Sequence, residues 1–261
     1  MRWLLGLFFL SSAAIVAADE CTLRMSVETD FPPHIIKQGE QWTGLSVELM
    51  QKLANSVACK LEFVNSPWLR SLQLSDAGEL DVLSHLSFNT ERQQQFAFIG
   101  PHHQEAIYLI GDPDQLPALE QLQQLADNTD IGSIAVLHGA YYGEEFKQLS
   151  RISQLAKQIV VISSIQDKLA LLRAHRVNAI LEDISVLQYW QQQDYPQARQ
   201  FQPLLKVFES PVYFGISKKS LSADRIAALA RAWQQLNDSG ELASIYAKYQ
   251  IATPLTPEPH L

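Results

Sequence analysis

Residues 84–98 read Ser-His-Leu-Ser-Phe-Asn-Thr-Glu-Arg-Gln-Gln-Gln-Phe-Ala-Phe and follow a predicted strand at residues 80–83. Small polar residues lead to a candidate helix N-cap at Asn89 or Thr90, and Arg92 begins a short polar turn. Free N–H groups at a helix start and the planar fork of an arginine both suit a carboxylate. The stretch therefore predicts an anion-binding loop at a strand end. The alternative is an ordinary strand-to-helix loop with a solvated Arg92.

Strands and helices alternate on both sides of this stretch. Leu45, Leu49 and Leu53 share one helical face, and Pro67 and Gly78 suit the start and the exit of the next helix. The expected strands are residues 22–28, 60–64, 80–83, 96–99, 107–110, 131–136, 158–162, 179–181, 204–209 and 212–217. The expected helices are residues 44–56, 67–78, 116–127, 139–149, 164–175, 184–193, 223–236 and 240–249. Consecutive βαβ units predict an α/β fold with parallel sheets, in which ligands sit beyond the carboxyl ends of the strands.

The first 18 residues have the composition of a secretory signal peptide. Arg2 supplies a short positive region, residues 3–10 are apolar, and the segment ends in the small residue Ala18. The apolar run is shorter than the roughly 20 residues that a membrane-spanning helix needs. We therefore expect cleavage after residue 18 and export, with an uncleaved anchor as the alternative.

The composition and length of the chain narrow its binding partners and its number of domains. The net charge of the chain is −8, and 47% of its residues are apolar. A negative protein is a poor partner for nucleic acid or for anionic lipid surfaces. The length allows one large domain or two smaller ones, each with its own core.

The chain has two cysteines, Cys21 and Cys59, and each precedes an expected strand. In an oxidising compartment such a pair usually forms a disulfide. If the two strands are parallel neighbours, their starts lie side by side and the bond fits. The alternatives are two free thiols or a metal pair, and neither cysteine has other ligands at metal-binding spacing.

Five motifs in order resemble the periplasmic solute-binding proteins of ABC amino-acid importers, family 3, over about residues 22–250. The pattern Ser-x-Leu-Ser-x-x-x-x-Arg-Gln-Gln in residues 84–98 resembles the ligand loop of that family. Phe-Pro-Pro-His at residues 31–34 and Thr-Gly-Leu-Ser-Val-Glu-Leu at residues 43–49 resemble two further segments near its N-terminus. Val-Leu-His-Gly at residues 136–139 and Asn-Ala-Ile-Leu-Glu-Asp at residues 178–183 resemble segments of its second lobe.

The resemblance implies a fold and a division of the chain. It implies the type II periplasmic-binding-protein fold, with two lobes, each a mainly parallel sheet flanked by helices, and a ligand cleft between them. After the signal peptide at residues 1–18, lobe 1 would comprise residues 19–105 and 209–261. Lobe 2 would comprise residues 106–208, and the two crossings would form a hinge.

The resemblance also implies contacts for an amino-acid ligand. Arg92 would bind the α-carboxylate, and Asp183 the ammonium group. Asp183 could instead cap a helix, and Glu28, at an acidic family position, could simply face solvent. The ligand loop also supplies Leu86 and Ser87.

Aromatic side chains could form the walls of the site. Phe31 and Trp68 would stack on the ligand, although core packing is the alternative for each. Tyr141 stands where the family usually has a small hydroxyl residue, and Ser46 replaces an aspartate at a helix start. These two departures leave the ligand class open.

Nothing in the sequence indicates a cofactor or a metal site. None of the seven histidines forms a His-x-x-x-His or Glu-x-x-His pair, and no nucleophile elbow or phosphate loop is present. His85 and His138 fall on expected cleft loops, as ligand contacts or as ordinary loop residues.

Two function classes remain. The first, which we favour, is a monomeric binding protein with no catalytic residues. Its partners would be an amino acid or similar small ligand and an ABC permease in the inner membrane. The second is a periplasmic enzyme on the same scaffold, such as a cyclohexadienyl dehydratase, with Glu28, Glu182 or His85 as its general acid.

Overall fold

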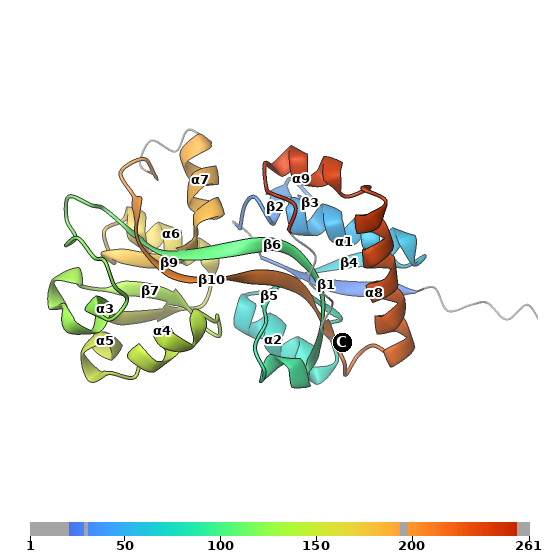
Figure 1. Ribbon diagram of the computed structural model, residues 1–261, viewed down its shortest axis with the longest axis horizontal. Coiled ribbons are helices and arrows are strands. Elements are labelled where there is room, and N and C mark those ends of the chain that lie inside the picture. Colours follow the sequence, from blue (N-terminus) through green and yellow to red (C-terminus); the bar gives the residue numbers. More distant parts are fainter. Residues whose placement is uncertain (1–20, 29–30, 194–197, 255–261) are drawn as a thin grey trace, which may run out of the picture.

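Two lobes lie side by side and are joined by two long strands (Figure 1). The computed structural model describes residues 21–28, 31–193 and 198–254, so the predicted signal peptide at residues 1–18 lies outside the described residues. Among the helices of these ranges, none combines the length and the apolar character that crossing a membrane requires.

Lobe 1 is built on three parallel strands flanked by helices. Its elements are β1 (Thr22–Val27), β2 (Ile36–Gln38), β3 (Gln41–Thr43), α1 (Leu45–Ser56), β4 (Lys60–Asn65), α2 (Trp68–Ala77), β5 (Val82–Ser87), the 3₁₀ turn η1 (Arg92–Gln94), α8 (Ala223–Asp238) and α9 (Ala243–Tyr249). Strand β1 pairs in parallel with β4 and with β5. Helix α1 buries Leu45, Leu49 and Leu53 completely, which is the face that the sequence predicts.

Lobe 2 repeats the parallel arrangement. Its elements are α3 (Gln124–Asp127), η2 (Thr129–Ile131), β7 (Ile134–Leu137), α4 (Gly143–Leu149), α5 (Ser153–Gln158), β8 (Ile159–Ile162), α6 (Ile165–Arg173), β9 (Ala179–Asp183) and α7 (Ile184–Gln192). Strand β7 pairs in parallel with both β8 and β9. The α/β fold class with mainly parallel sheets is confirmed.

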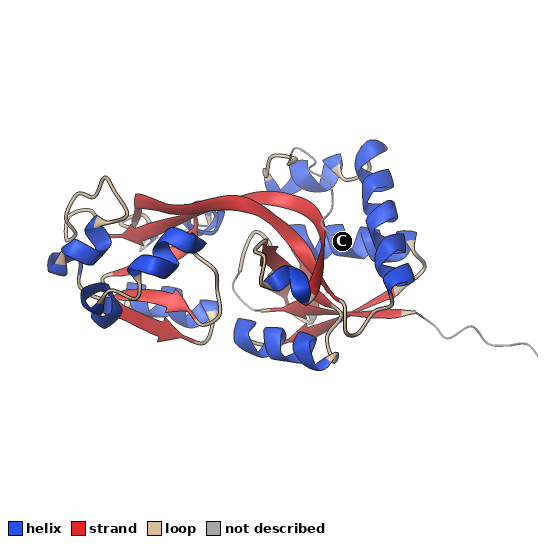
Figure 2. Cartoon of the chain, turned by 60° about the horizontal axis from the view of Figure 1, so that its bottom comes forward, coloured by secondary structure: helices blue, strands red, loops and turns tan. Residues whose placement is uncertain are grey.

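Strands β6 (Phe96–Gly111) and β10 (Gln202–Ser217) run from one lobe into the other as an antiparallel pair (Figure 2). Because β6 and β10 belong to both lobes, eight of the described strands form one sheet in the order β4-β1-β5-β10-β6-β9-β7-β8, and β2 and β3 form a separate hairpin sheet. The predicted lobe boundaries, 105/106 and 208/209, fall inside these two strands and stay a prediction.

The cysteines are joined by a disulfide between the ends of two neighbouring strands. Cys21 precedes β1 and Cys59 precedes β4, and the residues that follow them, Thr22 and Lys60, are paired in register. The bond closes a loop of 38 residues. On the chain-entropy model, a loop of this length contributes roughly 3–4 kcal/mol to the free energy of unfolding.

The structure corrects the secondary structure that the sequence predicts around the ligand loop. The strand expected at residues 80–83 is β5, which continues to Ser87, and no α-helix follows it. Asn89 accepts a hydrogen bond from the Arg92 amide at 2.8 Å, but it caps only the single turn η1. A helix start therefore cannot contribute to anion binding here, and Arg92 carries that prediction alone.

One further expectation was wrong, and four expected strands are confirmed as parts of two longer ones. The helix expected at residues 116–127 is reduced to α3, and the amides of Glu120 and Gln121 before it donate to the Gln124 side chain at 2.7 and 2.8 Å. The extended segments at residues 96–99 and 107–110 are parts of one strand, β6, as those at 204–209 and 212–217 are parts of β10. Backbone pairing continues through the polar residues between them, which a side-chain pattern does not reveal.

Candidate functional site

A cavity of about 90 Å³ lies between the lobes, at the carboxyl ends of their parallel strands. This is the usual ligand position in open α/β sheets. Seven of the eight predicted contact residues line it: Glu28, Phe31, Trp68, Ser87, Arg92, Tyr141 and Asp183.

Arg92 reaches both lobes from the turn after β5. Its guanidinium donates from Nη1 to the Ser87 carbonyl at 3.0 Å and from Nη2 to the Gly139 carbonyl of lobe 2 at 3.3 Å. The guanidinium carbon lies 5.8 Å from the ring centroid of Tyr141. Burial lowers the pKa of Arg92 to about 10, so the side chain is charged at neutral pH. Of its five donors, several remain for a ligand carboxylate.

Asp183 ends β9 and caps helix α7. Its Oδ1 accepts hydrogen bonds from the Ser185 amide at 2.7 Å and from the Ser185 hydroxyl. Its Oδ2 accepts from the Ala106 amide at 3.2 Å. Burial raises the pKa of Asp183 to about 6. The carboxylate is a helix cap that also faces the cavity, and an ammonium group would share its remaining lone pairs.

The predicted aromatic residues contact both the cavity and their neighbours. Phe31 is buried and packs edge-on against His85, with 4.8 Å between ring centroids. The Trp68 indole donates to the Gly139 carbonyl at 3.1 Å. Tyr141 packs edge-on against Phe208, 5.3 Å away. Phe31 and Trp68 belong to lobe 1 and Tyr141 to lobe 2, so aromatic walls stand on both sides of the cavity.

Glu28 connects the two lobes through backbone amides. Its Oε2 accepts from the Trp68 amide at 3.1 Å, and its Oε1 accepts from the Ile165 amide at the start of α6 at 2.9 Å. Burial outweighs these hydrogen bonds and raises the pKa of Glu28 to about 7. The cavity thus holds a carboxyl group that changes protonation near neutral pH.

The shifted pKa of Glu28 predicts a pH-dependent stability. The folded-state pKa of about 7 exceeds the ordinary value of 4.5, so between these values the folded protein holds a proton that the unfolded chain releases. The stabilisation is complete below about pH 4.5 and is lost as the pH rises through 7. From pH 5 to 7, the free energy of unfolding of the parent should fall relative to Glu28→Gln by up to about 1.4 kcal/mol per pH unit.

Urea unfolding at several pH values measures this difference. Glu62→Gln, at an exposed position of β4, is the matched control. Parallel profiles for the parent and Glu28→Gln would contradict the assignment.

A buried ion pair completes the polar wall, and sequence reasoning missed its lysine. Lys168 of α6 lies 2.7 Å from Glu182 Oε2 and donates to the Leu181 carbonyl at 2.9 Å. Burial opposes the charge of Lys168, but the nearby Glu182, Tyr142 and Glu28 hold its pKa above the ordinary value. The only signal in the sequence was Glu182, at the end of an expected strand.

Glu105 of strand β6 is a second residue that the sequence did not indicate. It is buried, lines the cavity and accepts hydrogen bonds from the hydroxyls of Ser87 and of Ser210, the latter at 3.2 Å. The resemblance placed a hinge strand near residues 104–107, but side-chain patterning left residues 100–106 without an expected strand, so nothing marked Glu105 as facing the site.

Leu86 is not a cavity residue. Successive residues of a strand point to opposite faces, and its neighbours His85 and Ser87 face the cavity. The Leu86 side chain is fully buried on the other face, in a cluster with Phe98 and Tyr213. We withdraw it from the candidate ligand contacts.

The expectation of no metal site stays a prediction, although the structure brings three histidines together that the sequence left apart. His34, His85 and His103 each bring one ring nitrogen to within 4.8 Å of the others. Burial, followed by the neighbouring histidines, lowers the pKa of His34 and His103 well below the ordinary value, so both rings are neutral. The sequence hid this cluster because its members come from three separate segments.

The geometry described so far defines a two-lobed, cleft-bearing α/β binding fold. The chain matches the bacterial extracellular solute-binding proteins, family 3, over residues 23–252, and it belongs to that family.

Two solved structures show the same fold. One is an ancestral arginine-binding protein bound to arginine, with a TM-score of 0.75 and 20% identity, covering 87% of this chain and 97% of that one. The other is an amino acid ABC transporter substrate-binding protein from Streptococcus pneumoniae bound to L-arginine, with a TM-score of 0.69 and 19% identity, covering 89% and 97%.

An enzyme is also similar to part of the chain. Cyclohexadienyl dehydratase of Pseudomonas aeruginosa is 29% identical over 107 residues. The match spans 39% of this chain and 40% of the enzyme.

Proposed function

We propose that the protein captures a small polar ligand, an amino acid or a related compound, in the cavity between its lobes. The observation that carries this proposal is the charge arrangement of the cavity. The Arg92 guanidinium has donors to spare on one side, and the buried carboxylates of Asp183 and Glu105 stand on strands β9 and β6. A zwitterion with a carboxylate and an ammonium group complements such a site.

The proposed function also implies a cellular location and a partner protein. The signal peptide at residues 1–18 directs the chain to the periplasm, where the monomeric protein presents its ligand to an ABC permease of the inner membrane. The solved amino acid ABC transporter substrate-binding protein of Streptococcus pneumoniae supports this role by its fold.

A ligand screen tests the proposal. Residues 19–261 are purified, unfolded and refolded to remove bound molecules, and melted with each of the twenty amino acids and with related metabolites. One chemical class should raise Tm, since a ligand at 100 times its Kd stabilises the folded state by about 2.7 kcal/mol. Mass spectrometry of the protein before unfolding identifies any ligand that co-purifies. A refolded protein that no compound stabilises, from a preparation without a bound small molecule, would contradict the proposal.

Glu28 supports a second candidate, an enzyme related in chemistry to cyclohexadienyl dehydratase. A carboxyl group with a pKa of about 7 inside a cavity is suited to general acid catalysis. Incubation with a cyclohexadienol acid, with ultraviolet detection of the aromatic product, tests this activity. The parent should turn over, and Glu28→Gln should bind without turnover. A parent protein that binds amino acids but shows no turnover would contradict the enzyme candidate and support the binding function.

A further inference from the structure

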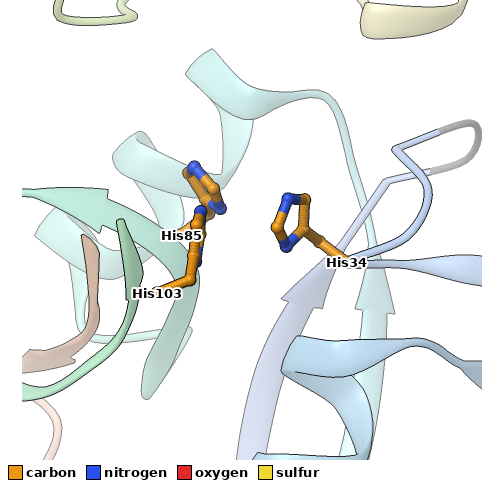
Figure 3. Close-up of side chains that lie close together, drawn as sticks. All are labelled: His34, His85 and His103. Atoms are coloured by element: carbon orange, nitrogen blue, oxygen red, sulfur yellow. The ribbon is translucent and has the colours of Figure 1, made fainter. Parts of the chain in front are cut away.

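Three histidines from separate segments meet beside the cavity (Figure 3). His34 lies in the loop after β1, His85 on β5 and His103 on β6. His34 and His103 have at most 1% of their surface exposed, and the His85 side chain 14%. Figure 3 shows the His34 ring approaching from one side and the rings of His85 and His103 from the other.

The hydrogen bonds of His34 fix which nitrogen carries its proton. Its Nε2 lies 2.9 Å from the Ser185 hydroxyl, which itself donates to the Asp183 carboxylate. Since the hydroxyl proton is already used, Nε2 of His34 is the donor to the serine oxygen. The neutral ring then presents a lone pair at Nδ1, which has no hydrogen-bond partner among the described residues.

The hydrogen bonds of His85 and His103 also indicate which nitrogen of each ring is the donor. His85 Nε2 lies 3.4 Å from a Glu105 carboxylate oxygen, which can only accept, so Nε2 is the donor and Nδ1, which has no partner among the described residues, is the nitrogen available to a metal. His103 Nδ1 lies 3.0 Å from Nδ1 of His102. When His103 is the donor of this pair, its Nε2, also without a partner in the described chain, carries the lone pair.

Each ring therefore has one nitrogen held by a neighbour and one buried nitrogen that needs a partner. Buried polar atoms are rarely left unsatisfied. A water molecule has only two protons to donate, so a single water cannot satisfy three acceptors. A metal ion satisfies all three lone pairs at once.

We propose that His34, His85 and His103 bind one divalent transition-metal ion of the zinc class beside the cavity. Three imidazole ligands suit Zn²⁺, Ni²⁺ or Cu²⁺ and not Mg²⁺ or Ca²⁺, which require oxygen ligands. In a tetrahedral zinc site with Zn–N bonds of about 2.0–2.1 Å, the ligand nitrogens lie roughly 3.4 Å apart. From separations within 4.8 Å, the ligand nitrogens close by about 1.4 Å or less. The His34 and His103 rings stack with 4.3 Å between centroids and 27° between planes, so binding also rotates these rings to point both lone pairs at the ion. His85 lines the cavity, so the proposed metal site adjoins it.

Each of the three rings has a hydrogen-bond partner for the nitrogen that would not bind the metal. Metal-binding histidines almost always donate their second nitrogen to an acceptor, and here Ser185, Glu105 and His102 take that part. The His34 backbone is fastened to the start of α1, where its carbonyl accepts from the Ser46 amide at 3.0 Å. This approach needs a glycine at position 44, because a Cβ there would lie 2.4 Å from the His34 carbonyl oxygen. The proposal rests on these contacts and not on the proposed amino-acid ligand.

Zinc titration of the purified protein tests the site. Residues 19–261 without a histidine tag are treated with a chelator, dialysed and titrated with Zn²⁺ by calorimetry. One equivalent should bind, Tm should rise, and Mg²⁺ should do neither. Replacing any one ligand, in His34→Gln, His85→Gln or His103→Gln, should weaken zinc binding by about 100-fold or more. Ser185→Ala, which removes the acceptor for His34 together with one hydroxyl donor to Asp183, should weaken it about tenfold.

His175→Asn is the matched control, since His175 is exposed at the end of α6 and asparagine tolerates its positive φ of 51°. It should bind zinc as the parent does. Circular dichroism in chelator shows which variants fold. If His34→Gln or His103→Gln does not fold, His85→Gln decides, because its ring is partly exposed. A parent that binds no zinc, or folded variants that bind it as tightly as the parent, would overturn the site.

Discussion

Arg92→Ala is expected to weaken binding of the ligand found by the screen by about two to three and a half orders of magnitude. The guanidinium is half-buried, charged and shared between the Ser87 and Gly139 carbonyls of the two lobes. Its loss would leave the ligand carboxylate buried without its partner, a cost of about 3–5 kcal/mol. Arg92→Lys keeps the charge but loses the planar fork, so it should fall between the parent and Arg92→Ala.

Isothermal titration calorimetry of the three proteins measures this effect. Arg70→Ala is the matched control, because Arg70 is exposed on α2 and does not line the cavity. Circular dichroism establishes that each variant is folded. A folded Arg92→Ala protein that binds within threefold of the parent would make Arg92 a structural residue and move the anchor to Tyr141.

Lys168→Met should strongly destabilise the folded protein. Lys168 and Glu182 are each 3% exposed and lie 2.7 Å apart. Removing the ammonium group leaves a buried carboxylate without its counter-charge, which typically costs about 3–5 kcal/mol. For a protein of this size the loss corresponds to a fall in Tm of roughly 6–20 °C.

The double variant Lys168→Met/Glu182→Gln separates the charge from the packing. It should recover most of the lost stability, since the uncompensated carboxylate is gone. Lys147→Met is the control, because Lys147 and Glu144 form an exposed pair at 3.6 Å whose loss should cost less than about 1 kcal/mol. A double variant as unstable as Lys168→Met would show that the lysine acts through packing alone.

The sequence determined the features that depend on neighbouring residues. The helical face of α1, the flanking Pro67 and Gly78 of α2, and the parallel units of both lobes follow from short-range periodicity and backbone preference. The disulfide was predictable because each cysteine precedes a strand, and parallel strand starts lie together. The five motifs and their order were enough to indicate the family.

Only the tertiary structure decided which distant groups share the cavity. The β6–β10 crossing places Glu105 beside Ser87 and Ser210, although side-chain patterning left this part of β6 unassigned. Lys168 reaches Glu182 because α6 packs on β9.

The histidine cluster is the plainest case of residues that only the tertiary structure brings together. Residues 34, 85 and 103 have no metal-binding spacing along the chain, and they meet because a loop and two strands converge next to the hinge. Local sequence determines which faces are buried, whereas strand register and lobe packing determine which buried polar atoms meet. The chemistry of this cavity therefore depends on strand register and lobe packing.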